Sequence, residues 1–336
     1  MAAYRFIAAP GDPLDRFDKF LVASLERAGA PASRSAVQRW IEAGRALIDG
    51  RQAVASQSVA MGAVVDLSPA IPEPSNLEAD PGVTFDVLFE DPYLIVIDKP
   101  AGLVMHPARG HAQKTLVHGL LARPSFSAER ATERGAGVGA GVGAAIVRPG
   151  IVHRLDKGTS GIVVVAKDEP TREGLKALFS RHDIERVYLA IVVGRATERM
   201  FETLHGRHRT DRLKFTTRVR AGKRAATRIQ VVERLAGDRA TLVECRLETG
   251  RTHQIRVHLS ECGATPVLGD PLYGKPSHDP WVRGIAERLG RQALHATVLG
   301  FVHPITRESL YFRREPPSDF MAALRALREG PPSPRA

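Results

Sequence analysis

Apolar residues recur with a helical period near the start of the chain. A spacing of three or four residues separates Leu14, Phe17, Leu21, Leu25 and Ala28. Gly29 follows this run, and glycine commonly ends a helix because it adopts the left-handed conformation without strain. The pattern predicts an amphipathic helix over residues 13–28 with one face buried in a core.

A second helix is expected to begin at Ser33 or Ser35 and to end at Gly44. One face of this helix carries the apolar residues Val37, Trp40 and Ile41. A strand and a tight turn follow at residues 46–51, and alternating apolar positions predict a further small hairpin at residues 59–65. The first part of the chain is therefore expected to form a small domain of two helices and short strands.

Residues 70–84 interrupt this patterning with three prolines, three acidic residues and no periodicity. Such a composition is typical of a stiff, extended linker at a domain boundary. We therefore expect a small domain over residues 1–70, a linker over 71–84, a large domain over 85–328 and a disordered, proline-rich tail over 329–336.

Runs of β-branched and aromatic residues dominate the large domain. Strands are expected at residues 85–90, 93–98, 162–165, 186–194, 242–248 and 249–259, and helices at 116–121, 171–182 and 318–328. Strands and helices do not alternate strictly, which argues against a parallel, doubly wound sheet. The expected fold class is α+β, with a mixed, largely antiparallel sheet and a central cleft.

A polar cluster stands directly before the apolar run at residues 162–165. It consists of His153, Arg154, Asp156, Lys157, Thr159 and Ser160. Gly158 and Gly161 allow the backbone to turn tightly, so the Asp156 carboxylate would be presented at the mouth of a rigid strand. Catalytic groups often lie in such loops, but a solvated turn gives the same pattern, and this fragment does not separate the two.

The charge of the chain is unevenly distributed. The formal net charge is +11, and residues 85–336 carry 40 Lys and Arg against 27 Asp and Glu. Residues 207–228, named here the basic segment, hold nine Lys and Arg and one acid, and they lack the apolar face of a membrane-binding helix. Contact with phosphates of a polyanion through Arg212, Lys214 and Arg218 is the favoured interpretation, and a solvated basic surface is the alternative.

Other sequence features bound the location and the chemistry. No apolar run approaches the length of a membrane span, and only Cys245 and Cys262 are present, outside any Cys-x-x-Cys pair. A cytoplasmic protein without disulfides or a thiolate zinc site is therefore expected. His253 and His258, five residues apart, cannot chelate one metal as a local pair. The glycine-rich match at residues 135–140 lacks the strand and helix that a dinucleotide site requires.

Four motifs occur in order along the chain. They are Lys99-Pro-Ala-Gly-Leu103, His153-Arg-Leu-Asp-Lys-Gly-Thr-Ser-Gly161, the strand around Tyr188, and Thr249-Gly-Arg-Thr-His-Gln-Ile-Arg-Val-His258. Together they resemble the RluA/RluD-type pseudouridine synthases, and the small front domain resembles the S4 RNA-binding module. Two departures are His118, where relatives typically carry Asn, and a Gly/Ala-rich insert at residues 135–145.

The resemblance implies an enzyme that detaches uracil from C1′ and reattaches it through C5, with no metal, nucleotide or redox cofactor. It implies that Asp156 is the catalytic carboxylate, that Arg256 is its ionic partner, and that Tyr188 stacks on the target base and helps to move the C5 proton. Arg154 would fill the gap left by the flipped nucleotide. Further RNA contacts are expected from Arg34, Arg39 and Arg45 in the S4-like module.

The motif layout is most similar to the RluD type, which implies uridines of large-subunit ribosomal RNA, free or in a pre-ribosomal particle, as the substrate. A monomer is expected. Two alternatives stay open: the same activity on another RNA such as tRNA, and a ribosome-assembly factor that binds RNA through the same surfaces without catalysis.

Overall fold

The computed structural model describes residues 4–30, 32, 34–69, 77–107, 113–126, 150–274 and 277–331. The chain divides into two compact units, Met1–Asn76 and Leu77–Ala336. The Gly/Ala-rich insert at residues 135–145 and the last residues of the expected tail, 332–336, lie outside the described residues. Within the described ranges, no helix combines the length and the apolar character needed to cross a bilayer.

Unit 1 packs two helices against a four-stranded antiparallel sheet. Its elements are β1 Tyr4–Ile7, α1 Phe17–Arg27, α2 Arg34–Glu42, β2 Ala46–Ile48, β3 Arg51–Gln52 and β4 Val64–Leu67, with the strand order β1-β4-β2-β3. The apolar face expected of the first helix is buried, with Phe17 and Leu21 fully inaccessible to solvent. Asp49 and Gly50, both with positive φ, form the tight turn between β2 and β3.

The small hairpin expected at residues 59–65 is wrong. Only β4 forms there, and it pairs with β1 and β2 instead of a neighbouring strand at residue 59. The alternation misled because Val59 is buried from a loop, where its N–H donates to Leu14 O over 2.9 Å, while Met61 is 58% exposed. Two short apolar positions do not distinguish a strand from a loop that covers a core.

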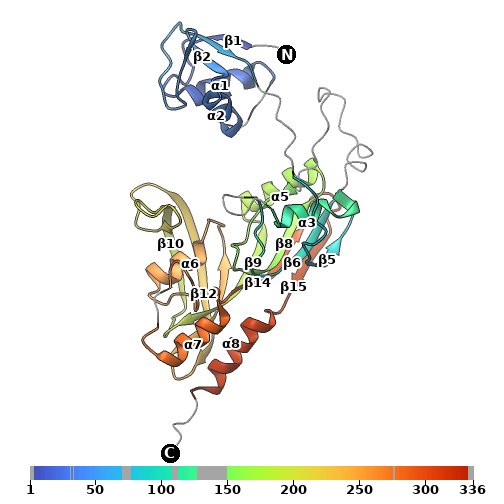
Figure 1. The fold of residues 1–336 in the computed structure, drawn as a ribbon, viewed down its shortest axis with the longest axis vertical. Coiled ribbons are helices and arrows are strands. Elements are labelled where there is room, and N and C mark those ends of the chain that lie inside the picture. Colours follow the sequence, from blue (N-terminus) through green and yellow to red (C-terminus); the bar gives the residue numbers. More distant parts are fainter. Residues whose placement is uncertain are drawn as a thin grey trace, which may run out of the picture. The chain divides into compact units, whose positions relative to one another are not determined.

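Unit 2 is built on one eleven-stranded sheet (Figure 1). Its strands are β5 Asp86–Glu90, β6 Leu94–Lys99, β7 Gly150–Ile151, β8 Ser160–Ala166, β9 Ile184–Val193, β10 Arg199–Arg207, β11 Phe215–Thr216, β12 Lys223–Leu235, β13 Ala240–Leu247, β14 Leu294–Val302 and β15 Ser309–Arg313. Along the sheet the order is β11-β10-β12-β13-β9-β14-β8-β6-β5, with β15 on β14 and β7 on β8. Every pair is antiparallel except β8 with β14, which confirms the mixed, largely antiparallel sheet.

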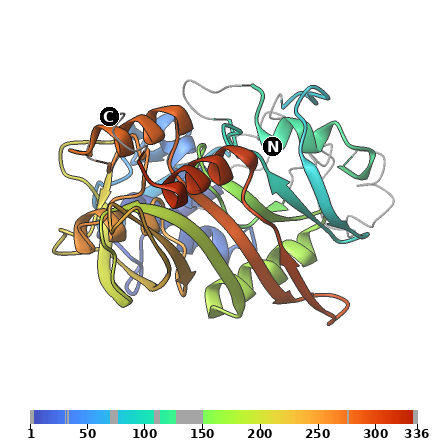
Figure 2. The ribbon, with the colours of Figure 1, turned by 90° about the horizontal axis from the view of Figure 1, so that it is seen from below.

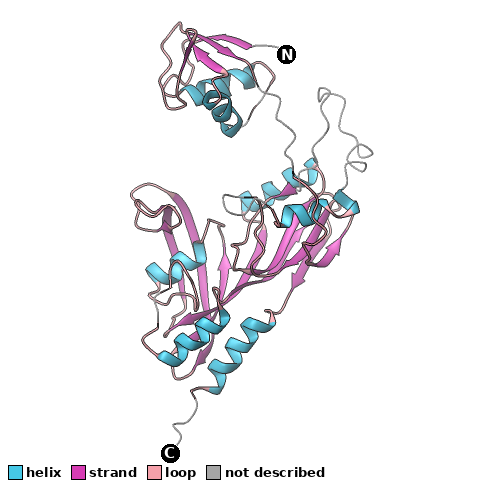
Figure 3. Ribbon diagram, in the orientation of Figure 1, coloured by secondary structure: helices cyan, strands magenta, loops and turns pink. Residues whose placement is uncertain are grey.

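Helices cover both faces of this sheet (Figures 2 and 3). They are α3 Leu116–Leu121, α5 Glu169–Arg181, α6 Gln254–Val257, α7 Pro280–Leu289 and α8 Ser318–Glu329. In β8, Val164 packs in one apolar cluster with Leu175 of α5, and Val165 packs in another with Leu120 of α3. Because successive strand residues point to opposite faces, a strand covered on both sides has an uninterrupted apolar sequence.

The junction between β8 and β14 requires a glycine. Gly161 has a φ of +117°, and a Cβ atom there would lie 2.3 Å from Ala296 O of β14. The two strands approach closely at this point, where His295 pairs with Ser160 and Ala296 with Gly161. The loop before β8 is thereby fixed at the centre of the sheet, beside the start of β14.

The described part of the expected linker belongs to unit 2. Residues 77–84 fall within this unit, and the N–H of Asp80 donates to His118 O of α3 over 3.0 Å. His118 accepts at Nδ1 from the N–H of Thr115 and lies 2.7 Å from the Thr115 hydroxyl, so it caps the start of α3. Its role in the described structure is local, at a helix end.

Candidate active site

Hydrogen bonds to backbone carbonyls hold the loop that carries Asp156. The Lys157 carbonyl accepts from the N–H of Gly102 over 2.8 Å and lies 3.4 Å from the Lys99 ammonium. The Gly158 carbonyl accepts from Arg291 Nη1 over 3.1 Å. These donors lie at the end of β6, in the turn after it, and in the segment before β14, so the loop is held from both strands that neighbour β8.

Lys99 is the most deeply buried of these donors. Its side chain is inaccessible to solvent, and Nζ also donates to the carbonyls of Pro100 and Leu103 over 2.8 and 2.9 Å. Burial lowers the pKa of Lys99 to about 7, and the nearby Asp156 carboxylate opposes that shift. The Lys99-Pro-Ala-Gly-Leu103 motif thus supports the Asp156 loop.

Asp156 lies in a cleft of about 660 Å³ whose lining is half polar. The cleft also exposes Arg154, Tyr188, Arg251 and Arg256, which come from the Asp156 loop, β9, the turn before α6, and α6. Asp156 is partly accessible, with a side-chain exposure of 15%, whereas Arg256 is 4% exposed. The structure thus brings together the three residues assigned to catalysis, at a hollow that can admit a ligand.

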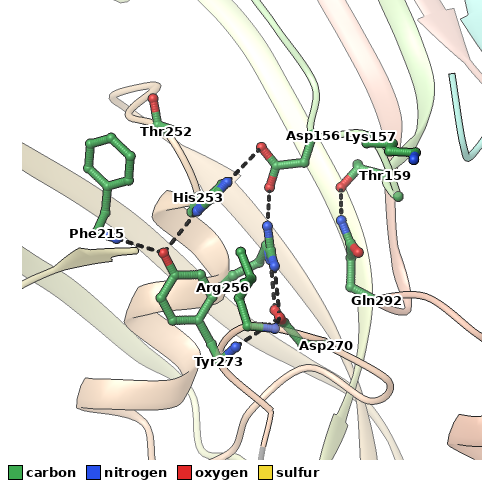
Figure 4. A network of polar contacts seen from close by, with 12 residues as sticks. Asp156, Lys157, Thr159, Phe215, Thr252, His253, Arg256, Asp270, Tyr273 and Gln292 are labelled. Atoms are coloured by element: carbon green, nitrogen blue, oxygen red, sulfur yellow. Dashed lines mark hydrogen bonds and ion pairs between the residues drawn. The ribbon is translucent and has the colours of Figure 1, made fainter. Parts of the chain in front are cut away.

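Arg256 bridges two carboxylates (Figure 4). Its Nη1 donates to Asp156 Oδ2 over 2.8 Å, while Nε and Nη2 donate to the two oxygens of Asp270 over 2.7 and 2.8 Å. Burial opposes the charge on Arg256, but its bonds with Asp270 and Asp156 raise its pKa above the ordinary value. A permanent cation therefore faces the Asp156 carboxylate from the protein side of the cleft.

The strand expected over residues 249–259 is wrong, because Arg256 lies on a helix. Residues 249–253 form a turn, α6 spans Gln254–Val257, and a wide helical turn continues over His258–Cys262. Gln254 fixes this geometry: Oε1 accepts from the Thr249 hydroxyl and the Arg251 N–H, and Nε2 donates to Ala226 O. These side-chain bonds override the β-branched character of the segment.

His253 and Tyr273 connect Arg256 to the basic segment. His253 Nδ1 lies 2.8 Å from the Tyr273 hydroxyl, which also accepts from the N–H of Phe215 over 2.8 Å. His253 Nε2 points at Asp156 Oδ1 from 3.8 Å (Figure 4). Burial lowers the pKa of His253, so the imidazole is neutral at neutral pH and the contact with Asp156 is not an ion pair.

Tyr188 forms part of the cleft wall from β9. It is 8% exposed, and it pairs across the sheet with Cys245 of β13 and Ala296 of β14. Burial raises the pKa of Tyr188 to about 12. The phenol is therefore neutral at neutral pH, which is compatible with its place beside the Asp156 carboxylate.

The residues assigned to RNA binding fall into three places. Arg154 is exposed and lines the cleft. Arg212, Lys214 and Arg218 lie in the basic segment, which comprises the end of β10, β11, the start of β12 and the loops between them. Arg34, Arg39 and Arg45 are exposed in unit 1, where Arg34 also pairs with the buried Asp18 over 2.9 Å and so has a structural contact that the sequence did not indicate.

Internal contacts give the basic segment a defined shape. The Phe215 ring stacks on His205 with centroids 5.5 Å apart, and the Arg207 guanidinium lies 5.2 Å from the Phe215 centroid. Glu261 accepts from the hydroxyls of Thr216 and Thr217. The aromatic and threonine side chains are therefore occupied with the protein, while Arg212 and Arg218 are exposed.

Asp270 and Tyr273 were not identified from the sequence. Both belong to the segment Gly269-Asp-Pro-Leu-Tyr-Gly274, whose glycines and proline indicate only a turn. Their link with Arg256 joins a turn to a helix that starts sixteen residues earlier in the chain, and a single sequence carries no signal for such a contact. The local sequence signal is a single carboxylate, Asp270, between Gly269 and Pro271.

Comparisons with known proteins indicate the family of this chain. Residues 93–261 match the model of the RNA pseudouridylate synthase family. The chain is 40% identical over 305 residues to "Ribosomal large subunit pseudouridine synthase D" of Xanthomonas campestris pv. campestris, covering 88% of this chain and 85% of that protein. It is 38% identical over 317 residues to "Uncharacterized RNA pseudouridine synthase YlyB" of Bacillus subtilis, covering 94% and 95%.

A solved structure shows the same fold in unit 2. "Human RNA Pseudouridylate Synthase Domain Containing 4" superposes with a TM-score of 0.50 and 27% identity, covering 72% of this chain and 93% of that one. The family match includes the Asp156 loop, Tyr188 and α6. The resemblance seen in the sequence motifs is thereby confirmed, and the chain belongs to the RNA pseudouridylate synthase family of isomerases, in its RluA branch.

Proposed function

We propose that this protein converts specific uridines of large-subunit ribosomal RNA into pseudouridine, as an enzyme of the RluD type. The observation that carries the proposal is the Asp156 carboxylate, partly exposed in a cleft of mixed polarity and held by the buried Arg256. The substrate follows from the relatives, several of which bear the name ribosomal large subunit pseudouridine synthase D.

Asp156 is the group that cleaves and re-forms the glycosidic bond. The N1–C1′ bond of the extruded uridine breaks, the base turns within the cleft, and a C5–C1′ bond forms; C5 loses a proton and N1 gains one, so the composition is unchanged. Asp156 must be ionised to act, and Arg256 stabilises that charge while leaving Oδ1 facing the cleft.

Tyr188 and Arg154 handle the base and the gap it leaves. The Tyr188 ring lines the cleft and stacks on the uracil, and its neutral hydroxyl helps to move the C5 proton. Arg154 is exposed at the cleft and takes the place of the flipped nucleotide in the RNA stack. Flipping costs a few kcal/mol and least in loops, so the target is an unpaired or weakly paired uridine.

Two basic regions supply RNA contacts outside the cleft. Arg212, Lys214 and Arg218 of the basic segment contact phosphates, and unit 1 acts as an S4-like RNA-binding domain through Arg34, Arg39 and Arg45. We further propose a monomer that works in the cytoplasm on free ribosomal RNA or on a pre-ribosomal particle, with residues 1–70 as the S4-like domain and 85–328 as the catalytic domain.

Mapping pseudouridine in ribosomal RNA from cells with and without the gene tests this function. The proposal predicts that pseudouridine disappears from a small set of large-subunit positions and returns when the gene is restored. Loss confined to tRNA would move the substrate to that RNA. An unchanged map, together with a defect in ribosome assembly, would favour a binding factor without catalysis.

A further inference from the structure

We propose that Asp270 is a positioning residue of this site: by accepting from both Nε and Nη2 of Arg256, it limits Arg256 to a single hydrogen bond with Asp156 and so keeps Asp156 Oδ1 free to react. The inference rests on the proposed function. Asp270 acts on Asp156 through Arg256, which binds both carboxylates.

The fork of Arg256 is divided unequally between the two carboxylates. Nε and Nη2, the geometry that arginine uses for its strongest pairing with a carboxylate, are both given to Asp270. Only Nη1 is left for Asp156, and it reaches Oδ2 over 2.8 Å. The guanidinium therefore supplies charge to Asp156 without engaging both of its oxygens.

Asp270 is itself fixed, so it can act as an anchor. Its side chain is fully buried, and Oδ1 also accepts from the backbone N–H groups of Leu272 and Tyr273 over 2.9 and 3.0 Å. The Tyr273 ring lies beside the guanidinium, with its centroid 5.1 Å from Arg256 Cζ. The turn after Gly269 thus fixes the Asp270 carboxylate. The carboxylate in turn fixes the orientation of the Arg256 guanidinium.

Without Asp270, the same arginine would be free to turn. A guanidinium released beside a carboxylate tends to pair through two parallel N–H bonds, because that geometry gives the most favourable interaction. Arg256 would then bind both oxygens of Asp156 and place a cation against Oδ1, the oxygen that otherwise lies 3.8 Å from His253 Nε2. Asp156 would remain ionised, but its Oδ1 would be bound to the Arg256 guanidinium.

The test is a single-turnover measurement on Asp270→Asn, as the full chain, with an unmodified fragment of large-subunit ribosomal RNA. The carboxamide keeps one oxygen that can accept from the backbone N–H groups of Leu272 and Tyr273, but it cannot accept from both Nε and Nη2 of Arg256 through two oxygens. We expect the rate constant to fall on the order of 100-fold while RNA affinity is unchanged, since small misplacements of a reacting group have effects of this size. A rate constant close to that of the wild type would overturn the proposal.

Asp279→Asn is the matched control. Asp279 likewise accepts from the N–H groups two and three residues later, of Trp281 and Val282, and pairs with an arginine, Arg239, over 2.8 Å. It starts α7 and does not line the cleft, so the control should keep the wild-type rate constant. An equal loss in both variants would show a general effect of weakening a turn and would contradict the proposal.

Two further measurements guard against misfolding. Asp270→Ser retains a hydroxyl for the turn amides, and the single-turnover amplitude separates the fraction of active protein from its rate constant. If both Asp270 variants lose amplitude but keep the wild-type rate constant, Asp270 is only structural and the proposal fails. In the Arg256→Gln background, adding Asp270→Asn should lower the rate no further, because the residue through which Asp270 acts is gone.

The control variant also separates this inference from the proposed function. If neither the wild type nor Asp279→Asn makes pseudouridine, the function itself is refuted. If both make it and Asp270→Asn does so at the same rate, only the positioning role is refuted.

Discussion

The basic segment offers a quantitative test of RNA binding. Arg212 and Arg218 are exposed, and Lys214 Nζ lies 3.7 Å from Asp211 Oδ2. If each contacts a phosphate, replacing all three by Gln removes three contacts and the counterions that they displace. The slope of log affinity against log salt should then flatten by about 0.7 per contact for single strands and 0.9 for duplex, or about 2 to 3 in total.

This slope corresponds to a large difference in measured affinity. Between 50 and 200 mM salt, the wild-type protein should lose about 20- to 40-fold more affinity than the triple variant. The assay is fluorescence anisotropy with a stem-loop of large-subunit RNA at four salt concentrations. Because Asp211 already compensates part of the charge of Lys214, we expect a difference in affinity loss at the lower end of this range.

A matched triple variant controls for net charge. Arg283, Arg288 and Arg325 are exposed on α7 and α8 and do not line the cleft, so replacing them by Gln lowers the net charge equally. This control should keep the wild-type slope. Equal slopes for all three proteins would refute phosphate contact by the basic segment and return it to a solvated surface.

Two further predictions concern side chains inside unit 2. Tyr188→Phe keeps the ring and removes the hydroxyl, so RNA affinity should be unchanged while the single-turnover rate falls on the order of 100-fold; an unchanged rate would leave stacking as its whole role. His258 is inaccessible to solvent, and burial lowers its pKa from 6.5 to about 4, so the unfolded chain takes up a proton first as the pH falls below 6.5. The free energy of unfolding should therefore decrease toward pH 4, and His258 alone should account for about 2 kcal/mol of this decrease at pH 5. Urea denaturation should show that the stability of His258→Gln depends less on pH than that of the wild type. An equal pH dependence in the two proteins would contradict a buried neutral imidazole.

The strands β6, β8, β9 and β13 could be predicted because most of their residues are buried on both faces. The run at β8 has no polar interruption, and the helix over residues 171–182 appears as α5, Glu169–Arg181. The position of Asp156 in the loop before β8 could also be predicted locally. The polar cluster that contains Asp156 is followed directly in the sequence by Gly161, which lies at the β8–β14 junction. Where apolar period and turn residues agree, the local sequence determines the element.

The remainder depends on contacts that a local pattern does not contain. Residues 254–257 are helical because Gln254 bonds to β12 across a long separation in the chain, which no period reveals. Asp270 is inconspicuous in its turn, and its importance arises only when the fold brings it to Arg256. The sequence therefore located the proposed catalytic carboxylate, Asp156, but not the hydrogen-bond network that orients its partner Arg256.

Asp156→Asn tests the central claim most directly. The substitution preserves shape and an oxygen for Arg256 Nη1, and it removes only the charge that the chemistry needs. With large-subunit RNA that the wild-type protein modifies, the account predicts normal RNA affinity and no pseudouridine above the protein-free background. Pseudouridine formed by the variant at the wild-type rate would contradict the account.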